Sequence, residues 1–413
     1  MDRSLFPVFR TATPYLAAFT ISLALGSYLN YVDNLYSVTL LEFKGQPLGI
    51  LVPLMGFLVS FSMWIFTKST VSSSEPTVAF LAALILAWVG HFIVLILHDN
   101  STFHTIWVCI PVLIMVGIKP PSISQLKYLL ASLFWTLAIA IVLTYFLELL
   151  NLLPVYFIPE EVRLFESGKY WIPLDGFLGF EGRWSGPFGY NSKTGFVGAL
   201  LVIYSLGNFK LRNVPILVIG ATTLLATDSR GAYIALIMGI ITLMVFTEKG
   251  PLANISRRVR IIVAGSGAAG TVLTFWVLNP NLTGRFGEGG IWAAYVELFQ
   301  TSPIIGVSRY AMSIEPGLVS KSMGAHNGYL EFLVSTGWVG LILILIPLFI
   351  SLVYSVRYAL SANAWPLALL VVYLFMNVTE VIDTSWLSFS IYTWMILLVT
   401  LISTQRDTSK IPF

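Results

Sequence analysis

Charged side chains are scarce in this sequence: Asp, Glu, Lys and Arg make up 10% of its 413 residues, while 57% are hydrophobic. Soluble domains carry about 25% charged residues, so this is not the composition of a soluble protein. A single cysteine, Cys109, excludes an intrachain disulfide and a cysteine metal site. The net charge of +3 is small and forms no basic stripe, so we expect no nucleic-acid partner.

Long apolar runs are what the sequence has in abundance. Runs of about 17–25 residues can cross a bilayer core of about 30 Å, and such spans must be helical because lipid offers the backbone no hydrogen-bond partners. Hydropathy predicts an all-α fold, a polytopic transmembrane helical bundle of about twelve spans, in one integral-membrane domain over residues 1–413. The predicted limits are about 13–32, 48–66, 77–97, 103–118, 128–149, 192–207, 213–227, 231–247, 261–278, 328–356, 365–380 and 387–403.

Two connections are far longer than the others, at about 150–191 and 279–327. An even number of spans puts both termini on one side, and most Lys and Arg residues of the short loops fall on that same side. The positive-inside rule makes this side cytoplasmic, so both long loops face outward. Long ordered loops are usually functional, and we therefore expect the site on the outer face.

Several basic residues remain on the outer face against that rule: Arg183, Lys193, Arg230, Arg285, Arg309 and Lys321. Because the positive-inside rule disfavours arginine on this face, arginines kept there indicate an anionic partner. In ATDSRGAYIAL (226–236), Asp228 and Arg230 lie between two apolar runs. Arg230 is a candidate anion ligand there, and the alternative is a pair with Asp228 that caps and orients a helix.

The segment EGRWSGPFGYNSKTGF (181–196) closes the first long loop, and its glycines and proline imply a turn-rich backbone. Arg183 and Lys193 are candidate phosphate or sugar contacts. Trp184 and Tyr190 would either stack on a sugar ring or anchor the loop at the membrane interface.

The second long loop begins with NPNLTGRFGEGGIWAAYVELFQTSPIIGVSRYAM (279–312), in which IWAAYVELF predicts a short amphipathic helix on the membrane surface. Arg285 and Arg309 flank this helix, and each alone is equally well explained as a solvated loop charge. Because Arg230 is expected on the same outer face, a cluster of these three arginines is the favoured interpretation. Upstream, GSGAAG (265–270) matches a dinucleotide-binding fingerprint, but no strand precedes it, so we expect close packing of membrane helices there.

In GAHNGYLEFLVSTGWVG (324–340), His326 precedes an apolar helix on the outer face. His326, Tyr329 and Leu333 share a helical face, followed by Gly337 and Gly340, where a neighbour can approach closely. The positive end of the helix dipole disfavours protonation of His326, which suits a general base beside bound anions. The alternative is an ordinary interface histidine.

These residues resemble the bacterial O-antigen ligase and O-antigen polymerase superfamily of integral-membrane glycosyltransferases. His326-Asn327, nine residues, then Gly337 and Gly340 is similar to the ligase signature. The other similar segments are SRGA (229–232), GRWSGPFGYN (182–191), GR (284–285) and SPIIGV (302–307). The similarity extends over about 182–340, with departures at Tyr190, Ile234 and Ser308.

The resemblance implies a donor glycan on undecaprenyl diphosphate at the periplasmic face of the bacterial inner membrane, with both termini cytoplasmic. By position, His326 would be the catalytic base, and Arg230 and Arg285 would bind the donor diphosphate. Further candidate substrate contacts are Arg183, Arg309, Lys193, Asn327, Tyr329 and Trp184. Attack on the anomeric carbon would invert its configuration. We expect no cofactor, and no metal because the outer loops contain no Asp-x-Asp pair.

The acceptor separates the two nearest functions. A ligase of lipopolysaccharide biosynthesis transfers the glycan to a sugar of the lipid A core, whereas a polymerase transfers it to a second carrier-linked repeat unit. The His-Asn signature favours the ligase, although polymerases share it. A transporter of lipid-linked sugar would bind near the bilayer midplane, but the deep spans here are nearly free of charge, with Glu148 the main exception.

Overall fold

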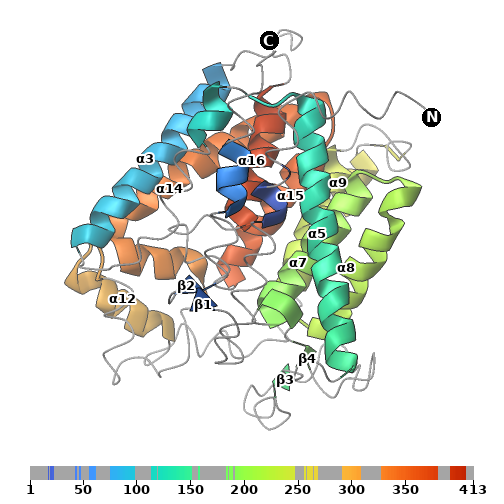
Figure 1. Cartoon of the computed structure of the whole chain (residues 1–413), viewed down its shortest axis with the longest axis horizontal. Coiled ribbons are helices and arrows are strands. Elements are labelled where there is room, and N and C mark those ends of the chain that lie inside the picture. The colour runs from blue at the N-terminus through green and yellow to red at the C-terminus, as the bar shows by residue number, and fades with distance from the viewer. Residues whose placement is uncertain are drawn as a thin grey trace.

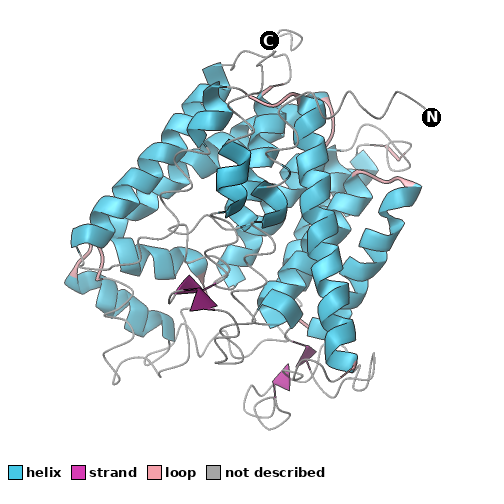
Figure 2. Ribbon diagram, viewed as in Figure 1, coloured by secondary structure: helices cyan, strands magenta, loops and turns pink. Residues whose placement is uncertain are grey.

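The computed structural model describes residues 17, 19–22, 42–43, 46–47, 55–61, 75–97, 113–118, 120–150, 157–158, 183–184, 186–188, 191–246, 255–256, 258–263, 265–267, 291–307, 327–379 and 391–405. Most of these residues are helical (Figure 2), and the strands among them are two residues long. The all-α prediction is therefore confirmed for the described part of the chain.

The predicted spans 13–32, 48–66, 103–118 and 261–278 lie mostly outside the described residues. The helices of the described part follow the other predicted spans closely, except α12, which lies in the second long loop. They are α3 (Glu75–Leu97), α5 (Ile123–Leu149), α7 (Asn191–Gly207), α8 (Val214–Thr227), α9 (Arg230–Phe246), α12 (Ile291–Thr301), α14 (Gly328–Ser361), α15 (Trp365–Thr379) and α16 (Ile391–Thr404). The strands β1 (Glu42–Phe43) and β2 (Gln46–Pro47) pair antiparallel, as do β3 (Phe157–Ile158) and β4 (Arg183–Trp184). Two 3-10 turns, η4 (Gly186–Phe188) and η5 (Leu211–Asn213), precede α7 and α8.

Local sequence signals fix several helix ends. Ser122 accepts from the backbone amide of Gln125, and the side chain of Gln125 accepts from the amide of Ser122 in return, so a capping box starts α5. Pro215 stands in the first turn of α8, where its missing N–H has no helical partner to lose. These local signals lie close to the ends of the apolar runs, so most predicted helix limits are correct to within a few residues.

The helices run between two ends of one bundle. The side chain of Asn191 at the start of α7 donates to the carbonyl of Thr227 at the end of α8, and α9 begins three residues later. At the far side of the bundle, Gly207 at the end of α7 faces Trp365 at the start of α15. The end where α7, α9, α14 and α16 begin, and where α5, α8 and α15 finish, is called the Arg230 end below.

Helices α3, α5 and α16 also run between these two ends of the bundle. The hydroxyl groups of Thr77 at the start of α3 and Thr404 at the end of α16 hydrogen-bond at 2.9 Å, and the side chain of Gln405 donates to the carbonyl of Pro121 before α5. Both contacts lie at the end opposite Arg230. Figure 1 shows β4 beside the last turn of α5 at the bottom of the view, with α12 at the lower left.

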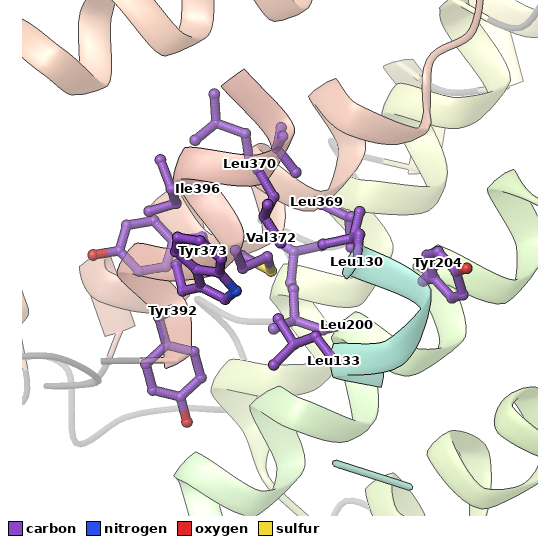
Figure 3. Close-up of a cluster of buried hydrophobic side chains, with 14 of the residues drawn as sticks. Leu130, Leu133, Leu200, Tyr204, Leu369, Leu370, Val372, Tyr373, Tyr392 and Ile396 are labelled. Carbon is purple, nitrogen blue, oxygen red and sulfur yellow. The ribbon is translucent and has the colours of Figure 1, made fainter. Parts of the chain in front are cut away.

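Aromatic and aliphatic side chains from α5, α7, α15 and α16 form the core (Figure 3). Phe134 of α5 stacks on Tyr204 of α7 with ring centroids 4.4 Å apart, and Phe196 of α7 contacts Tyr392 of α16 at 5.1 Å. The labelled residues of this core are Leu130, Leu133, Leu200, Tyr204, Leu369, Leu370, Val372, Tyr373, Tyr392 and Ile396. Because this core joins helices from both halves of the sequence, it holds the bundle together.

By length and composition, α5 and α14 are apolar and long enough to cross a membrane. The other apolar helices among the described residues are shorter in their apolar stretches, such as Arg230–Phe246 and Trp365–Val378. The count of about twelve spans and the outward direction of the two long loops therefore stay predictions.

The close packing predicted for GSGAAG can be checked at two of its glycines. Residues 265–267 of GSGAAG are helical, but a Cβ on Gly265 would meet no atom within 4 Å, and one on Gly267 would come no closer than 3.9 Å to Ile241. Neither of these two positions therefore needs glycine for close packing against the described residues, although a Cβ on Gly267 would be in ordinary contact with α9. The rest of the motif lies outside the described residues.

Candidate functional site

Arg230 is the first residue of α9, directly after a turn of two residues that joins α8 to α9. Asp228 ends α8 in the left-handed conformation with φ 42°, and its amide donates to the carbonyl of Leu224. The hydroxyl of Ser229 accepts from the amide of Ala232, which is the bond of an N-cap residue. This geometry places the half-buried Arg230 at the positive end of the α9 dipole, where charge and dipole both favour an anion.

The start of α7 packs directly against this turn. A Cβ on Gly195 would lie 2.7 Å from the Cβ of Ser229 and 2.8 Å from the hydroxyl oxygen of Thr227, so only glycine fits at this contact. Lys193, half-buried in the first turn of α7, therefore lies at the same end of the bundle as Arg230. The predicted cluster of Arg230 with Arg285 and Arg309 stays a prediction.

Strand β4 carries Arg183 and Trp184 to the Arg230 end. Trp184 is only 2% exposed, and its indole nitrogen donates to a carboxylate oxygen of Glu148 at 2.5 Å. Its ring also packs edge-on against Tyr145. Trp184 thus lies inside the fold against α5 rather than on a surface where a sugar can stack. The backbone of Arg183 belongs to β4, and its side chain lies outside the described part of the structure.

The start of α14 is held by a cap and by α15. The side chain of Asn327 accepts from the amide of Leu330 at 3.0 Å, so Asn327 is the N-cap residue of the helix. The hydroxyl of Tyr329 donates to the carbonyl of Leu374, and a Cβ on Gly328 would lie 2.6 Å from the side-chain oxygen of Asn377. Both candidate substrate contacts therefore have structural partners.

Helix α15 connects the two helices that carry the main candidates. Its Val372 faces Gly239 of α9, the helix that begins at Arg230. Its Leu374 and Asn377 contact the first turn of α14, which follows His326 in the sequence. The position of Arg230 relative to the start of α14 is thus set by packing of buried helices rather than by a loop.

Three of the predicted site residues, His326, Arg285 and Arg309, lie outside the described residues. Their roles therefore stay predictions. The structure describes the elements next to them in the sequence. Helix α12 lies between Arg285 and Arg309 in the chain, and Asn327 caps the helix that follows His326.

The buried carboxylate of Glu331 was not predicted from the sequence; it is 5% exposed in the first turn of α14. A carboxylate in the first turn is stabilised by the helix dipole. The pairing of Glu148 with Trp184 was also not predicted, although a lone carboxylate at the end of an apolar span was a signal for a buried partner.

The described basic residues divide unequally between the two ends. At the end opposite Arg230 lie Lys127, Lys210, Arg212, Arg258, Arg260 and Arg357. Arg260, for example, donates to the carbonyl of Met244 near the end of α9. At the Arg230 end, the described basic residues are Arg183, Lys193 and Arg230.

The two apolar helices of spanning length, α5 and α14, suggest a membrane protein. Residues 215–345 match the model of a protein family described as O-antigen ligase. Over these residues the chain is similar to the O-antigen ligase family, which agrees with the resemblance inferred from the motifs. The chain matches no protein in a search of curated proteins.

Proposed function

We propose that this protein is an O-antigen ligase-type glycosyltransferase. It transfers a glycan from undecaprenyl diphosphate to a sugar of the lipid A core at the periplasmic face of the bacterial inner membrane. The observation that carries this proposal is the family match over 215–345, which includes Arg230 and extends past the cap of α14. The bridging of α9 and α14 by α15 supports it, because that packing holds the two candidate elements at one end of the bundle.

The orientation follows from the distribution of charge. Loops rich in Lys and Arg stay in the cytoplasm, so the end that holds Arg212, Arg258 and Arg357 is the cytoplasmic end. The Arg230 end then faces the periplasm, where the lipid-linked donor and the lipid A core meet, and both termini are cytoplasmic.

The residues have complementary roles in the transfer. The acceptor hydroxyl oxygen bonds to the anomeric carbon of the donor as the bond from that carbon to the diphosphate oxygen breaks. His326 takes the proton of the hydroxyl as general base. Arg230 and Arg285 hold the charge that develops on the leaving diphosphate, which is electrostatic stabilisation. Attack from the face opposite the diphosphate inverts the configuration, and the reaction needs neither a metal nor a cofactor.

The remaining candidates fall into two groups. Lys193, Arg183 and Arg309 are cationic and are proposed to contact the phosphates or the sugar. Asn327, Tyr329 and Trp184 have partners inside the protein, and we propose that they act mainly by holding α14 and β4 in place.

The test is the surface polysaccharide of a deletion strain of the source organism, complemented with wild type or with His326→Ala and separated on a gel. The proposal requires that deletion leaves bare lipid A core while long glycan accumulates on its carrier, and that only wild type restores attachment. A core bearing one repeat unit would instead identify a polymerase. Full complementation by His326→Ala would rule out the mechanism and favour a transporter.

A further inference from the structure

Helix α14 is broken at Gly337, near its start. The backbone there has φ 67° and ψ −170°, which is not helical, and a Cβ on Gly337 would lie 2.2 Å from the carbonyl oxygen of Ile304. Only glycine is compatible with both features. Figure 1 shows the two parts of α14 running in different directions, with α12 beside the shorter part.

Residues 303–307, which follow α12, supply the hydrogen bonds that the break removes. In an unbroken helix the amide of Trp338 would donate to the carbonyl of Val334. Here the amide of Trp338 donates to the carbonyl of Pro303 at 2.9 Å, and the carbonyl of Val334 accepts from the amide of Val307 at 2.9 Å. Both halves of the missing bond are thus satisfied by the same short segment.

A second bond is exchanged in the same way, because the amide of Val339 donates to the carbonyl of Ile304 at 3.2 Å. Non-helical backbone at membrane depth is tolerated only where protein supplies such partners. The break of α14 and residues 303–307 therefore form one hydrogen-bonded unit, although about thirty residues of sequence separate them.

Packing fixes the segment as tightly as hydrogen bonding does. Gly306 has φ 76°, and a Cβ on it would lie 2.4 Å from the backbone carbon of Ser335. Val307 packs with Val334 and Tyr295 in a small apolar cluster, and Phe299 contacts Trp338 edge-on at 5.8 Å. The short helix predicted over IWAAYVELF is thereby confirmed as α12, and its apolar residues pack on α14. Its position on the membrane surface stays a prediction.

The break sets the direction of the residues that lead back to His326. At 1.5 Å per residue, residues 338–361 alone make a helix of about 36 Å, enough for a bilayer core of about 30 Å. An unbroken helix from 328 would be about 51 Å long and would carry its first residues well beyond the membrane surface. The break instead turns residues 328–336 toward α12 and α15.

We propose, resting on the function proposed above, that residues 303–307 are a positioning segment for the transfer reaction. Docked in the break, they fix the direction of residues 328–336 and hence the place of His326 relative to Arg230. Gly306 and Gly337 are the positioning residues, because a side chain at either would displace the segment. The same contact ties the loop that carries Arg285 and Arg309 to the helix that follows His326.

The glycine variants test this proposal in purified enzyme, with donor lipid extracted from the deletion strain and lipid A core as acceptor. Gly306→Ala and Gly337→Ala should lower the turnover number at least tenfold while the KM for the donor changes less than threefold, since Arg230 stands on a different helix. Gly265→Ala, which places its methyl group in open space, is the matched control and should behave as wild type. Wild-type turnover in both Gly306→Ala and Gly337→Ala would overturn the proposal.

A disulfide tests it independently of whether those variants fold. In a Cys109→Ser background, Val307→Cys with Val334→Cys links the segment to the helix, because these two side chains pack in one cluster. The oxidised enzyme should keep at least half of its turnover. Loss of activity on oxidation that returns with reductant would show that the segment must leave the break, and would overturn the proposal. The pair Thr77→Cys with Thr404→Cys, at the opposite end, controls for cross-linking itself.

His326→Ala separates failure of this inference from failure of the proposed function. If His326→Ala transfers glycan as wild type does, the proposed function fails and this inference fails with it. If His326→Ala is inactive while Gly306→Ala and Gly337→Ala keep wild-type turnover, only the positioning role is wrong.

Discussion

The indole nitrogen of Trp184 donates to the carboxylate of Glu148 across 2.5 Å, and this bond joins β4 to the last turn of α5. Both side chains are buried, with exposed fractions of 2% and 1%. The bond spans 36 residues of sequence and holds the end of the first long loop to the bundle. Its removal from either side leaves a buried polar group without its partner.

Trp184→Phe should therefore lower the free energy of unfolding by about 1–3 kcal/mol, because the Glu148 carboxylate loses its donor while the ring volume is largely kept. The temperature at which the detergent-solubilised protein loses its monodisperse peak measures this loss. The double variant Trp184→Phe with Glu148→Leu lacks both groups of the bond. Its loss of stability should be smaller than the sum of the losses in the two single variants. Strictly additive losses would mean that the bond contributes nothing.

Gly195→Ala should destabilise the contact between α7 and the turn before Arg230. The added methyl group would lie 2.7 Å from the Cβ of Ser229, and overpacking of this kind costs about 1–3 kcal/mol. Thermal stability and transfer should both fall, since the turn must shift. Gly265→Ala is the control and should change neither. An active, fully stable Gly195→Ala protein would contradict the described packing.

Variants of Asn327 distinguish a role as helix cap from a role as substrate contact. Asn327→Ala should cost about 0.5–2 kcal/mol through loss of the bond to the Leu330 amide, and Asn327→Ser should restore most of that stability because serine is also a good N-cap residue. Activity should follow stability across the three proteins. If Asn327→Ser is stable but inactive, the amide group contacts substrate directly.

Arg230→Ala should reduce transfer about a hundredfold or more, as removal of one stabilising donor at a developing charge does. The protein should still accumulate in the membrane, because Arg230 is half-buried at a helix start rather than in the core. Arg230→Lys should recover part of the activity, since lysine carries the charge without the bidentate geometry of arginine. Normal transfer by Arg230→Ala would show that Arg230 does not bind the donor diphosphate.

Helix limits were the part of the fold that the sequence predicted best. The start of α14 at Gly328 and the ends of α3, α5 and α7 follow from apolar runs, caps and turn residues, all of which are local signals. The grouping of Lys193 and Arg230 at one end was also predictable, because alternation of spans decides which helix ends lie together.

The break at Gly337 was not predictable from the same signals. The apolar run continues through it, and a glycine in such a run indicates close packing as readily as a break. Its positive φ depends on residues 303–307, which reach it only in the folded protein. Trp184 was misleading for a related reason: an aromatic in a glycine-rich loop resembles a sugar contact until its buried partner Glu148 is known.

The most direct test of the account is transfer by the purified protein, with undecaprenyl diphosphate-linked glycan as donor and lipid A core as acceptor, in the presence of EDTA. We expect wild type to join glycan to core with inverted configuration in EDTA. His326→Ala and Arg230→Ala, purified as equally monodisperse proteins, should do so at least a hundredfold more slowly. Transfer abolished by EDTA and restored by a divalent cation would contradict the metal-independent mechanism, and undiminished transfer by His326→Ala would contradict the proposed base.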